Sequence, residues 1–300
     1  MSNDWQLDPY LKERIHLTES ALDLYLPGTE TLPASLHEAM RYSVFAGGKR
    51  IRPVLMMAAC EAVGGTPKQV LPAACAIEMI HSYSLIHDDL PAMDDDDFRR
   101  GKPSNHKAYG EAKAILAGDG LLTEAFILLS SPRVFTDLDG EKRREVINLL
   151  ARNAGSRGMV GGQVVDMESE GKEVDLPTLE YIHTHKTGAL ILAAIEIGAI
   201  IGGADAEQRR ALCRYGEAAG LAFQVADDIL DIVADQDELG KDVGSDQERK
   251  KATYPALLGL DGARERAREL RKLAFSSLDV FGESARPLRE IASYIVDRSF

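Results

Sequence analysis

Residues 73–97, AACAIEMIHSYSLIHDDLPAMDDDD, combine the two features that define the architecture of this chain. The first part, Ala73–Ile86, is apolar on almost every face of a helix, which predicts a central helix surrounded by other elements. The stretch then turns acidic at Asp88 and Asp89 and again from Asp94. A helix C-terminus already carries negative dipole charge, so clustered carboxylates there repel one another unless a cation lies between them. We therefore expect a buried helix with a cation site at its C-terminal end.

A second acidic cluster, Asp227-Asp228-Ile229-Leu230-Asp231, lies near the end of another long helical stretch. Residues four apart share a helix face, so Asp227 and Asp231 point together with Asp228 alongside. Oxygen ligands without nearby His or Cys suit Mg²⁺, which commonly takes one or two carboxylates plus substrate phosphates. Two such clusters on two core helices predict a Mg²⁺ site for a phosphorylated substrate.

The first cluster is spread over more residues than the second and contains Pro91. A proline at this point should loosen the last helical turn and let Asp94 return towards Asp88. The acidic run that follows, Asp95–Asp97, is interpreted as solvated surface. His183 and His185 are two apart on an expected helix, so they face different sides, and we interpret both as structural.

Helix-forming residues dominate the whole chain, whereas strand-like alternation of β-branched and polar residues is nearly absent. Expected helices cover residues 8–25, 34–46, 51–64, 73–90, 107–130, 141–155, 178–201, 207–233 and 262–276. No linker, low-complexity tract or fixed-period repeat separates the two halves. The sequence therefore predicts an all-α protein with a single domain over residues 1–300.

Basic residues that suit phosphate binding accompany both acidic clusters. Residues 47–53, GGKRIRP, place three cations in four residues after a glycine pair, without the earlier glycine and the Ser or Thr of a P-loop. Further cations lie at Arg99-Arg100, Lys186 and Lys241. Arginine pairs with phosphate in a bidentate way, and lysine acts as a point charge.

The overall composition argues against several classes of protein. A net charge of −13 lacks the positive field that sequence-independent nucleic-acid binding needs. The three separated cysteines are interpreted as free thiols in a reducing compartment, so a cytoplasmic location is expected. The N-terminal residues lack a secretory signal pattern, and the most apolar stretch, 188–204, is too short and too interrupted for a membrane span. We interpret it as a buried helix.

The motifs LIHDDLPAMDDDDFRRG, GGKRIRP, HKTG, GGQVVD, FQVADDILD and GKDVGSDQERKKATYP together resemble those of one family. Their identity and order are similar to those of trans-prenyltransferases (isoprenyl diphosphate synthases), most of all the bacterial farnesyl diphosphate synthases. The similarity runs from about residue 37 to the C-terminus. It implies a single isoprenoid-synthase helical bundle around a deep central active-site cavity, usually in a homodimer. The implied substrates are isopentenyl diphosphate and an allylic diphosphate.

The resemblance also implies roles for particular residues. The metal ligands implied for a cluster of three Mg²⁺ ions are Asp88, Asp94 and Asp227, with Asp89, Asp228 and Asp231 in direct or water-mediated support. The residues implied to hold the allylic diphosphate are Arg99, Lys186, Thr187, Gln224 and Lys241, and those for isopentenyl diphosphate are Lys49, Arg52, His81 and Arg100. The implied reaction ionises the allylic diphosphate, couples the cation to the second substrate and loses a proton. Water must be excluded, and the apolar residues Ala76, Ile77, Ile80 and Ala222 suit that demand.

Product length is expected to depend on Tyr83, which lies five residues before Asp88, about 7.5 Å along the helix axis. In the family, an aromatic residue there accompanies a C15 product, which favours farnesyl diphosphate. Geranylgeranyl or geranyl diphosphate is the alternative. A terpene cyclase and a non-catalytic partner subunit are disfavoured, because the chain keeps GGKRIRP and both complete acidic motifs.

Overall fold

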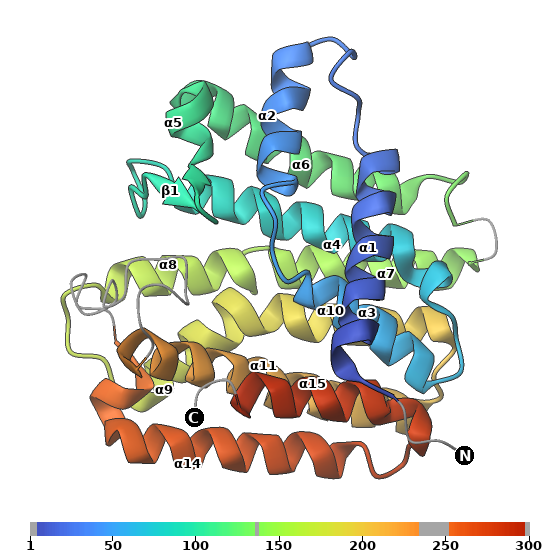
Figure 1. Ribbon diagram of the computed structural model, residues 1–300, viewed down its shortest axis with the longest axis vertical. Helices are drawn as coiled ribbons and strands as arrows, with labels where there is room; N and C mark the ends of the chain where they lie inside the picture. Colours follow the sequence, from blue (N-terminus) through green and yellow to red (C-terminus); the bar gives the residue numbers. More distant parts are fainter. Residues whose placement is uncertain (1–4, 136–137, 234–251, 298–300) are drawn as a thin grey trace.

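The computed structural model describes residues 5–135, 138–233 and 252–297 (Figure 1). Helices account for most of these residues, and the short strands β1 and β2 form the hairpin that the described part contains. The elements are α1 (Leu7–Tyr25), α2 (Ala34–Val44), α3 (Ile51–Ala62), α4 (Pro67–Asp88), β1 (Phe98–Arg99), β2 (Lys102–Pro103), α5 (Asn105–Tyr109), α6 (Glu111–Ser130), α7 (Gly140–Ala154), α8 (Met159–Ser169), α9 (Leu176–Ile182), a π-helical turn η1 (His183–Gly188), α10 (Ala189–Gly202), α11 (Ala206–Val233), α14 (Tyr254–Ser277), a 3₁₀ turn η2 (Glu283–Ala285) and α15 (Arg286–Asp297). The all-α prediction is confirmed.

Helix α4 occupies the centre of one half of the fold, as the sequence predicts. Thr66 and Gln69 form a capping box at its start, and Pro67 occupies the first turn, where it costs no hydrogen bond. The side chains from Ala73 to Ile80 are buried on every face. Burial all round means that neighbouring helices enclose α4, so its C-terminal carboxylates have a fixed position.

Two apolar clusters form the core. One gathers α4 with parts of α1, α2, α6 and α7, and the other gathers α11, α14 and α15. Helices α3 and α10 contribute residues to both, for example Met57 and Val54 from α3. Figure 1 shows the consequence, with α4 and α6 above α10, and α11, α15 and α14 below it. The two helices that carry the acidic clusters, α4 and α11, therefore lie on opposite sides of α10.

Several helix boundaries differ from the expected ones. The range 178–201 divides into α9, the π-helical turn and α10, and the range 107–130 divides at Gly110, whose φ is 84°. Helix α14 begins at Tyr254, earlier than expected, and is kinked at Gly259. Helices α8 and α15 are absent from the sequence prediction. The expectation of one domain over residues 1–300 stays a prediction.

One helical stretch among the described residues, Leu176–Gly202, is long and apolar enough to cross a membrane by length and composition. Its apolar window is 61% buried against the rest of the protein. Ala193, Ala194 and Ile197 are completely buried. This burial agrees with the interpretation of the stretch as a core helix.

Candidate active site

The first acidic cluster folds back on itself after the end of α4. The amide of Asp94 donates a hydrogen bond to the carbonyl oxygen of Asp88, with 2.8 Å between nitrogen and oxygen. Asp95 follows with a left-handed φ of 51°, which turns the chain away towards the β-hairpin. The turn brings two carboxylates, six residues apart in sequence, to the same end of α4.

Burial and neighbouring charges act together on Asp88. Burial raises the pKa of its carboxyl to about 6, the nearby carboxylates of Asp94 and Asp89 add to the increase, and Lys186 and Arg99 oppose it. Such a rise means that the ionised form lacks full compensation from the protein. A cation between Asp88 and Asp94 would supply the missing charge.

The β-hairpin directs two arginines to different partners. Its two-residue turn, Arg100-Gly101, has positive φ at both positions, as a tight hairpin requires. The Arg99 Nε donates to the buried carboxylate of Asp89 at 2.9 Å, and its Nη2 donates to Asp96 at 2.9 Å. The interpretation of this run as solvated surface is therefore wrong for Asp96, which joins the cluster through Arg99. Exposed Asp97 instead pairs with Lys107 at 2.6 Å on the surface.

The three aspartates of the second cluster have different surroundings on α11. The Asp227 carboxylate lies close enough to Arg52 for its charge to raise the pKa of that guanidinium, against the larger opposing effect of burial. Asp228 is buried and accepts a hydrogen bond from the Tyr254 amide at 2.9 Å, while His183 Nε2 lies 3.1 Å from the same oxygen. Asp231 is half-buried. The role implied for Asp228 in metal binding stays a prediction, and the contacts that the structure gives it are structural.

The π-helical turn η1 carries Lys186 and Thr187. The ammonium of Lys186 is 2.7 Å from the carboxylate of Asp166 on α8, and its charge lowers the pKa of Asp88. Helix α8 packs so closely on this turn that a Cβ at Gly162 would lie 2.2 Å from the Lys186 amide nitrogen. Half-buried Gln224 precedes Asp227 by about one turn of α11. Lys241 lies outside the described residues.

A group of arginines surrounds His81 on α4. Burial lowers the pKa of the imidazole well below its ordinary value, and the charges of Arg52 and Arg100, followed by Arg50 and Arg99, lower it further. Burial also lowers the pKa of Arg52 to about 10. Lys49, three residues before Arg52, is exposed. Clustered cations with so little water repel one another, and a diphosphate would relieve that repulsion.

The glycine pair at 47–48 accommodates Arg100. The Arg100 Nη1 donates to the carbonyl oxygen of Gly47, and a Cβ at Gly48 would lie 2.6 Å from the Arg100 Cζ. Both glycines have positive φ, 100° and 127°. A side chain at Gly48 would therefore displace Arg100 from the group around His81.

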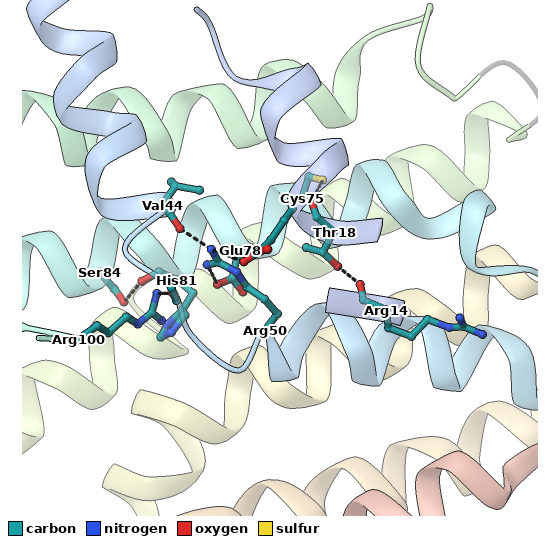
Figure 2. Close-up of polar contacts among 11 residues, drawn as sticks. Arg14, Thr18, Val44, Arg50, Cys75, Glu78, His81, Ser84 and Arg100 are labelled. Atoms are coloured by element: carbon teal, nitrogen blue, oxygen red, sulfur yellow. Dashed lines mark hydrogen bonds and ion pairs between the residues drawn. The ribbon is translucent and has the colours of Figure 1, made fainter. Parts of the chain in front are cut away.

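Arg50, the middle cation of GGKRIRP, has a different environment from its neighbours. Its guanidinium is completely buried, donates to Glu78 on α4 at 2.7 Å and reaches the carbonyl oxygen of Val44 (Figure 2). Figure 2 also shows His81 and Arg100 next to one another close to this pair. Arg50 thus points into the protein, whereas Arg52 and Arg100 face His81.

The aspartate arrangement fits Mg²⁺ better than a protein-only metal cage. Among the described residues, no three Cys, His, Asp or Glu side chains are grouped closely enough to hold a metal ion by themselves. Mg²⁺ commonly binds through one or two carboxylates and completes its octahedron with water and substrate phosphates. Asp88 and Asp94 at the end of α4, and Asp227 and Asp231 on α11, are the residues that would hold such ions.

Tyr83 lies on α4 one turn before His87. It is 7% exposed, and its ring meets the His87 ring edge-on with 5.7 Å between centroids. Burial raises the pKa of its hydroxyl to about 12, and the charge of Asp88 adds to the rise. The tyrosine is therefore an uncharged ring held close to the first acidic cluster.

Four residues with prominent contacts in this region escaped the sequence reasoning: Arg50 as a buried cation, Glu78, Asp166, and His183 as a partner of Asp228. Asp166 is the last residue of the motif GGQVVD, so the sequence carried a signal for it. Glu78 is a single charged residue inside an apolar helix, which is unusual and required a partner. Nothing in the local sequence identifies Arg50 as that partner.

Comparison with known proteins gives a consistent result. The polyprenyl synthetase family profile matches residues 33–279. The farnesyl diphosphate synthase of Geobacillus stearothermophilus is 54% identical over 274 residues, which cover 90% of this chain and 88% of that protein. The geranylgeranyl diphosphate synthase of Cyanophora paradoxa is 44% identical over 300 residues, 100% of this chain and 99% of that protein. The crystal structure of an FPP/GFPP synthase from Zymomonas mobilis has a TM-score of 0.85 and 40% identity, covering 97% of this chain and 100% of that one.

Proposed function

The chain belongs to the polyprenyl synthetase family and is a short-chain trans-prenyl diphosphate synthase, and we propose that its main product is farnesyl diphosphate. Tyr83 carries this proposal. Its buried ring lies one to two turns before Asp88 on α4, where it would meet the growing hydrocarbon tail of a substrate whose diphosphate lies at the acidic clusters. The 54% identity to a farnesyl diphosphate synthase supports the same product.

We propose that the two diphosphates bind at separate groups of side chains. The allylic diphosphate lies between the acidic clusters, where Lys186, Arg99 and the Mg²⁺ ligands converge. The isopentenyl diphosphate lies at Arg52, Arg100 and His81. With each diphosphate held at its own group of side chains, the allylic C1 lies next to the double bond of the second substrate. This arrangement turns a bimolecular step into an intramolecular one.

When bound, Mg²⁺ supplies Lewis-acid neutralisation of the leaving diphosphate. Lys186, held by Asp166, contributes a fixed positive charge on the same side as Asp88. A preorganised charge stabilises the developing diphosphate anion without the reorganisation that water would require. The apolar residues Ala76, Ile77 and Ile80 of α4 keep water away from the reactive carbon, because water would capture the allylic cation.

Geranylgeranyl diphosphate is the second candidate product, supported by the 44% identity to a geranylgeranyl diphosphate synthase over the full chain. The experiment that separates the two sizes the products by mass spectrometry after incubation with Mg²⁺, isopentenyl diphosphate and dimethylallyl diphosphate. We expect C15 diphosphate from the wild type and longer products from Tyr83→Ala. A C20 product from the wild type, unchanged in the variant, would contradict the role of Tyr83 and favour the second candidate.

Three further properties belong to the same proposal. We propose Mg²⁺ as the metal, in up to three sites when substrate is bound. Loss of activity in EDTA and its recovery with added Mg²⁺ test this proposal.

A homodimer is supported by the exposed apolar side chains of Ile115, Leu116 and Ile127 on α6, and light scattering measures the mass of the assembly. A cytoplasmic location is supported by the free thiols of Cys60, Cys75 and Cys213, and cell fractionation tests it.

A further inference from the structure

Glu78 is a buried carboxylate in the middle of α4 to which the function assigns no role. It is 1% exposed, and its partner Arg50 has a fully buried side chain, with 2.7 Å between Arg50 Nη1 and Glu78 Oε1. Figure 2 shows the two side chains facing each other, Glu78 from α4 and Arg50 from the residue that precedes α3. An ion pair buried this deeply persists only when geometry and further hydrogen bonds satisfy both groups.

The pair holds the segment that joins α2 to α3. Arg50 Nη2 donates to the carbonyl oxygen of Val44, the last residue of α2, so one guanidinium connects α2, α4 and the start of α3. Arg50 also has a left-handed φ of 47°, a conformation that a residue with a side chain adopts only when its surroundings enforce it. The ion pair with Glu78 and the hydrogen bond to Val44 hold Arg50 in that conformation.

The segment between α2 and α3 also contacts the group of arginines around His81. Arg100 donates to the carbonyl oxygen of Gly47, and Arg52 lies two residues after Arg50. The charge of Glu78 raises the pKa of both Arg52 and Arg100, against the opposing effect of burial, so the carboxylate lies close to all three arginines. Glu78 thus faces the arginines from inside the protein, while the substrate would face them from outside.

We propose that Glu78 is a positioning residue for the diphosphate of the second substrate. It holds Arg50, and through Arg50 it fixes residues 47–52 so that Lys49, Arg52 and Arg100 converge on His81. The inference rests on the proposed function, because it takes that group of cations as the isopentenyl diphosphate site. It extends the site to a side chain that touches neither substrate.

Two physical effects of Glu78 predict opposite results for Glu78→Gln. If the carboxylate only lowered the positive potential of the site, its neutralisation would strengthen the attraction between the arginines and a diphosphate. If it positions the segment, the loss of its charge weakens the hold on Arg50, whose other carboxylate neighbour, Glu19, lies 3.6 Å away, and binding weakens. The sign of the change in KM therefore distinguishes positioning from charge balance.

The experiment is steady-state kinetics on the full-length enzyme, with each substrate varied while the other is saturating. For Glu78→Gln we expect the KM for isopentenyl diphosphate to rise by about tenfold or more, with the KM for the allylic diphosphate within about twofold of wild type. Glu61→Gln is the matched control, because Glu61 also forms an ion pair with an arginine, but away from the site. The distance between Arg14 Nη2 and Glu61 Oε1 is 2.7 Å. We expect both of its KM values to equal those of the wild type.

Two further variants cover the case in which Glu78→Gln fails to fold. The double variant Arg50→Met with Glu78→Leu leaves no charge buried alone, and we expect the same selective rise in KM because the segment is still released. Glu78→Asp keeps the charge one methylene further away and should give an intermediate rise. An unchanged or lower KM for isopentenyl diphosphate, or equal rises for both substrates, would overturn the inference. An inactive wild type would instead contradict the proposed function.

Discussion

The amide of Asp94 donates a hydrogen bond to the carbonyl oxygen of Asp88, with a nitrogen–oxygen distance of 2.8 Å. In a regular helix this carbonyl would bind the amide four residues later, which here is the amide of Ala92. Here α4 ends at Asp88, and its carbonyl oxygen binds the Asp94 amide instead. The expectation that Asp94 returns towards Asp88 in the turn that contains Pro91 is confirmed. Two carboxylates can therefore face one cation from positions that a continuous helix would separate by about two turns.

The first prediction concerns this pair and the metal. Asp88→Asn removes one charge from the site, and we expect kcat/KM to fall by at least ~100-fold, with more Mg²⁺ needed for half-maximal rate. A Mg²⁺ titration at saturating substrates measures both. Asp97→Asn is the control, because exposed Asp97 pairs with Lys107 and should behave as wild type. Equal Mg²⁺ requirements in Asp88→Asn and wild type would contradict the metal assignment.

The second prediction concerns the contact between His183 and Asp228. His183→Ala leaves a buried carboxylate with one fewer partner, so we expect the free energy of unfolding to fall by about 1–3 kcal/mol. Urea denaturation followed by circular dichroism measures the change. His185→Ala, which removes a half-buried ring stacked on Tyr181, should cost less. A larger loss in His185→Ala than in His183→Ala would show that the buried contact contributes little.

The third prediction follows from the depressed pKa of His81. Burial and the arginines from α3 and the β-hairpin keep its folded-state pKa well below the unfolded value of about 6.5. The unfolded chain then binds more protons at acidic pH, so the free energy of unfolding falls as pH decreases through about 6.5. In His81→Gln this share of the acid sensitivity should disappear. Urea midpoints at about pH 7.5 and pH 5.5 measure it, and an unchanged difference between the two pH values would contradict the prediction.

The fourth prediction concerns the packing of α4 against α6. A Cβ at Gly118 would lie 2.1 Å from the His87 Nε2, and the His87 ring is also held at 3.1 Å from the carbonyl oxygen of Ile115. We expect Gly118→Ala to lower the free energy of unfolding by about 1–3 kcal/mol, because the ring must move. Gly120→Ala is the control on the same helix, where the nearest atom is the flexible Met40 sulfur at 3.0 Å. Equal losses in the two variants would remove the steric explanation.

Much of this architecture can be predicted from the sequence because its signals are local. The uniformly apolar face pattern of Ala73–Ile86 predicts the enclosed helix α4, and the spacing of Asp227 and Asp231 predicts their common face. The phosphate-binding role of the cations in GGKRIRP and Arg99-Arg100 is predicted by their residue types and their positions in the sequence. Each of these features depends on residues a few positions apart, where helix geometry determines which side chains lie together.

The remaining features depend on long-range contacts that local patterns do not encode. Helix α8 contains two adjacent glycines, which have a low helix propensity. Gly162 is required there because Lys186 of the π-helical turn packs against it and leaves no room for a side chain. The contact of Asp228 with His183 joins residues 45 apart, and Arg50 finds Glu78 across 28 positions. Tertiary packing decides all three, so sequence reasoning could not assign these partners, and it gave Glu78 no role at all.

The binding of metal between the two aspartate clusters is tested most directly by a crystal structure of the enzyme with Mn²⁺ in place of Mg²⁺, an unreactive allylic diphosphate analogue and isopentenyl diphosphate. Anomalous scattering from Mn²⁺ locates the metals without reference to side chains. We predict metal between the first cluster, Asp88 and Asp94, and the second, Asp227 and Asp231, with the second diphosphate at Arg52, Arg100 and His81. Metal bound away from both clusters, or both diphosphates at the arginines, would contradict it.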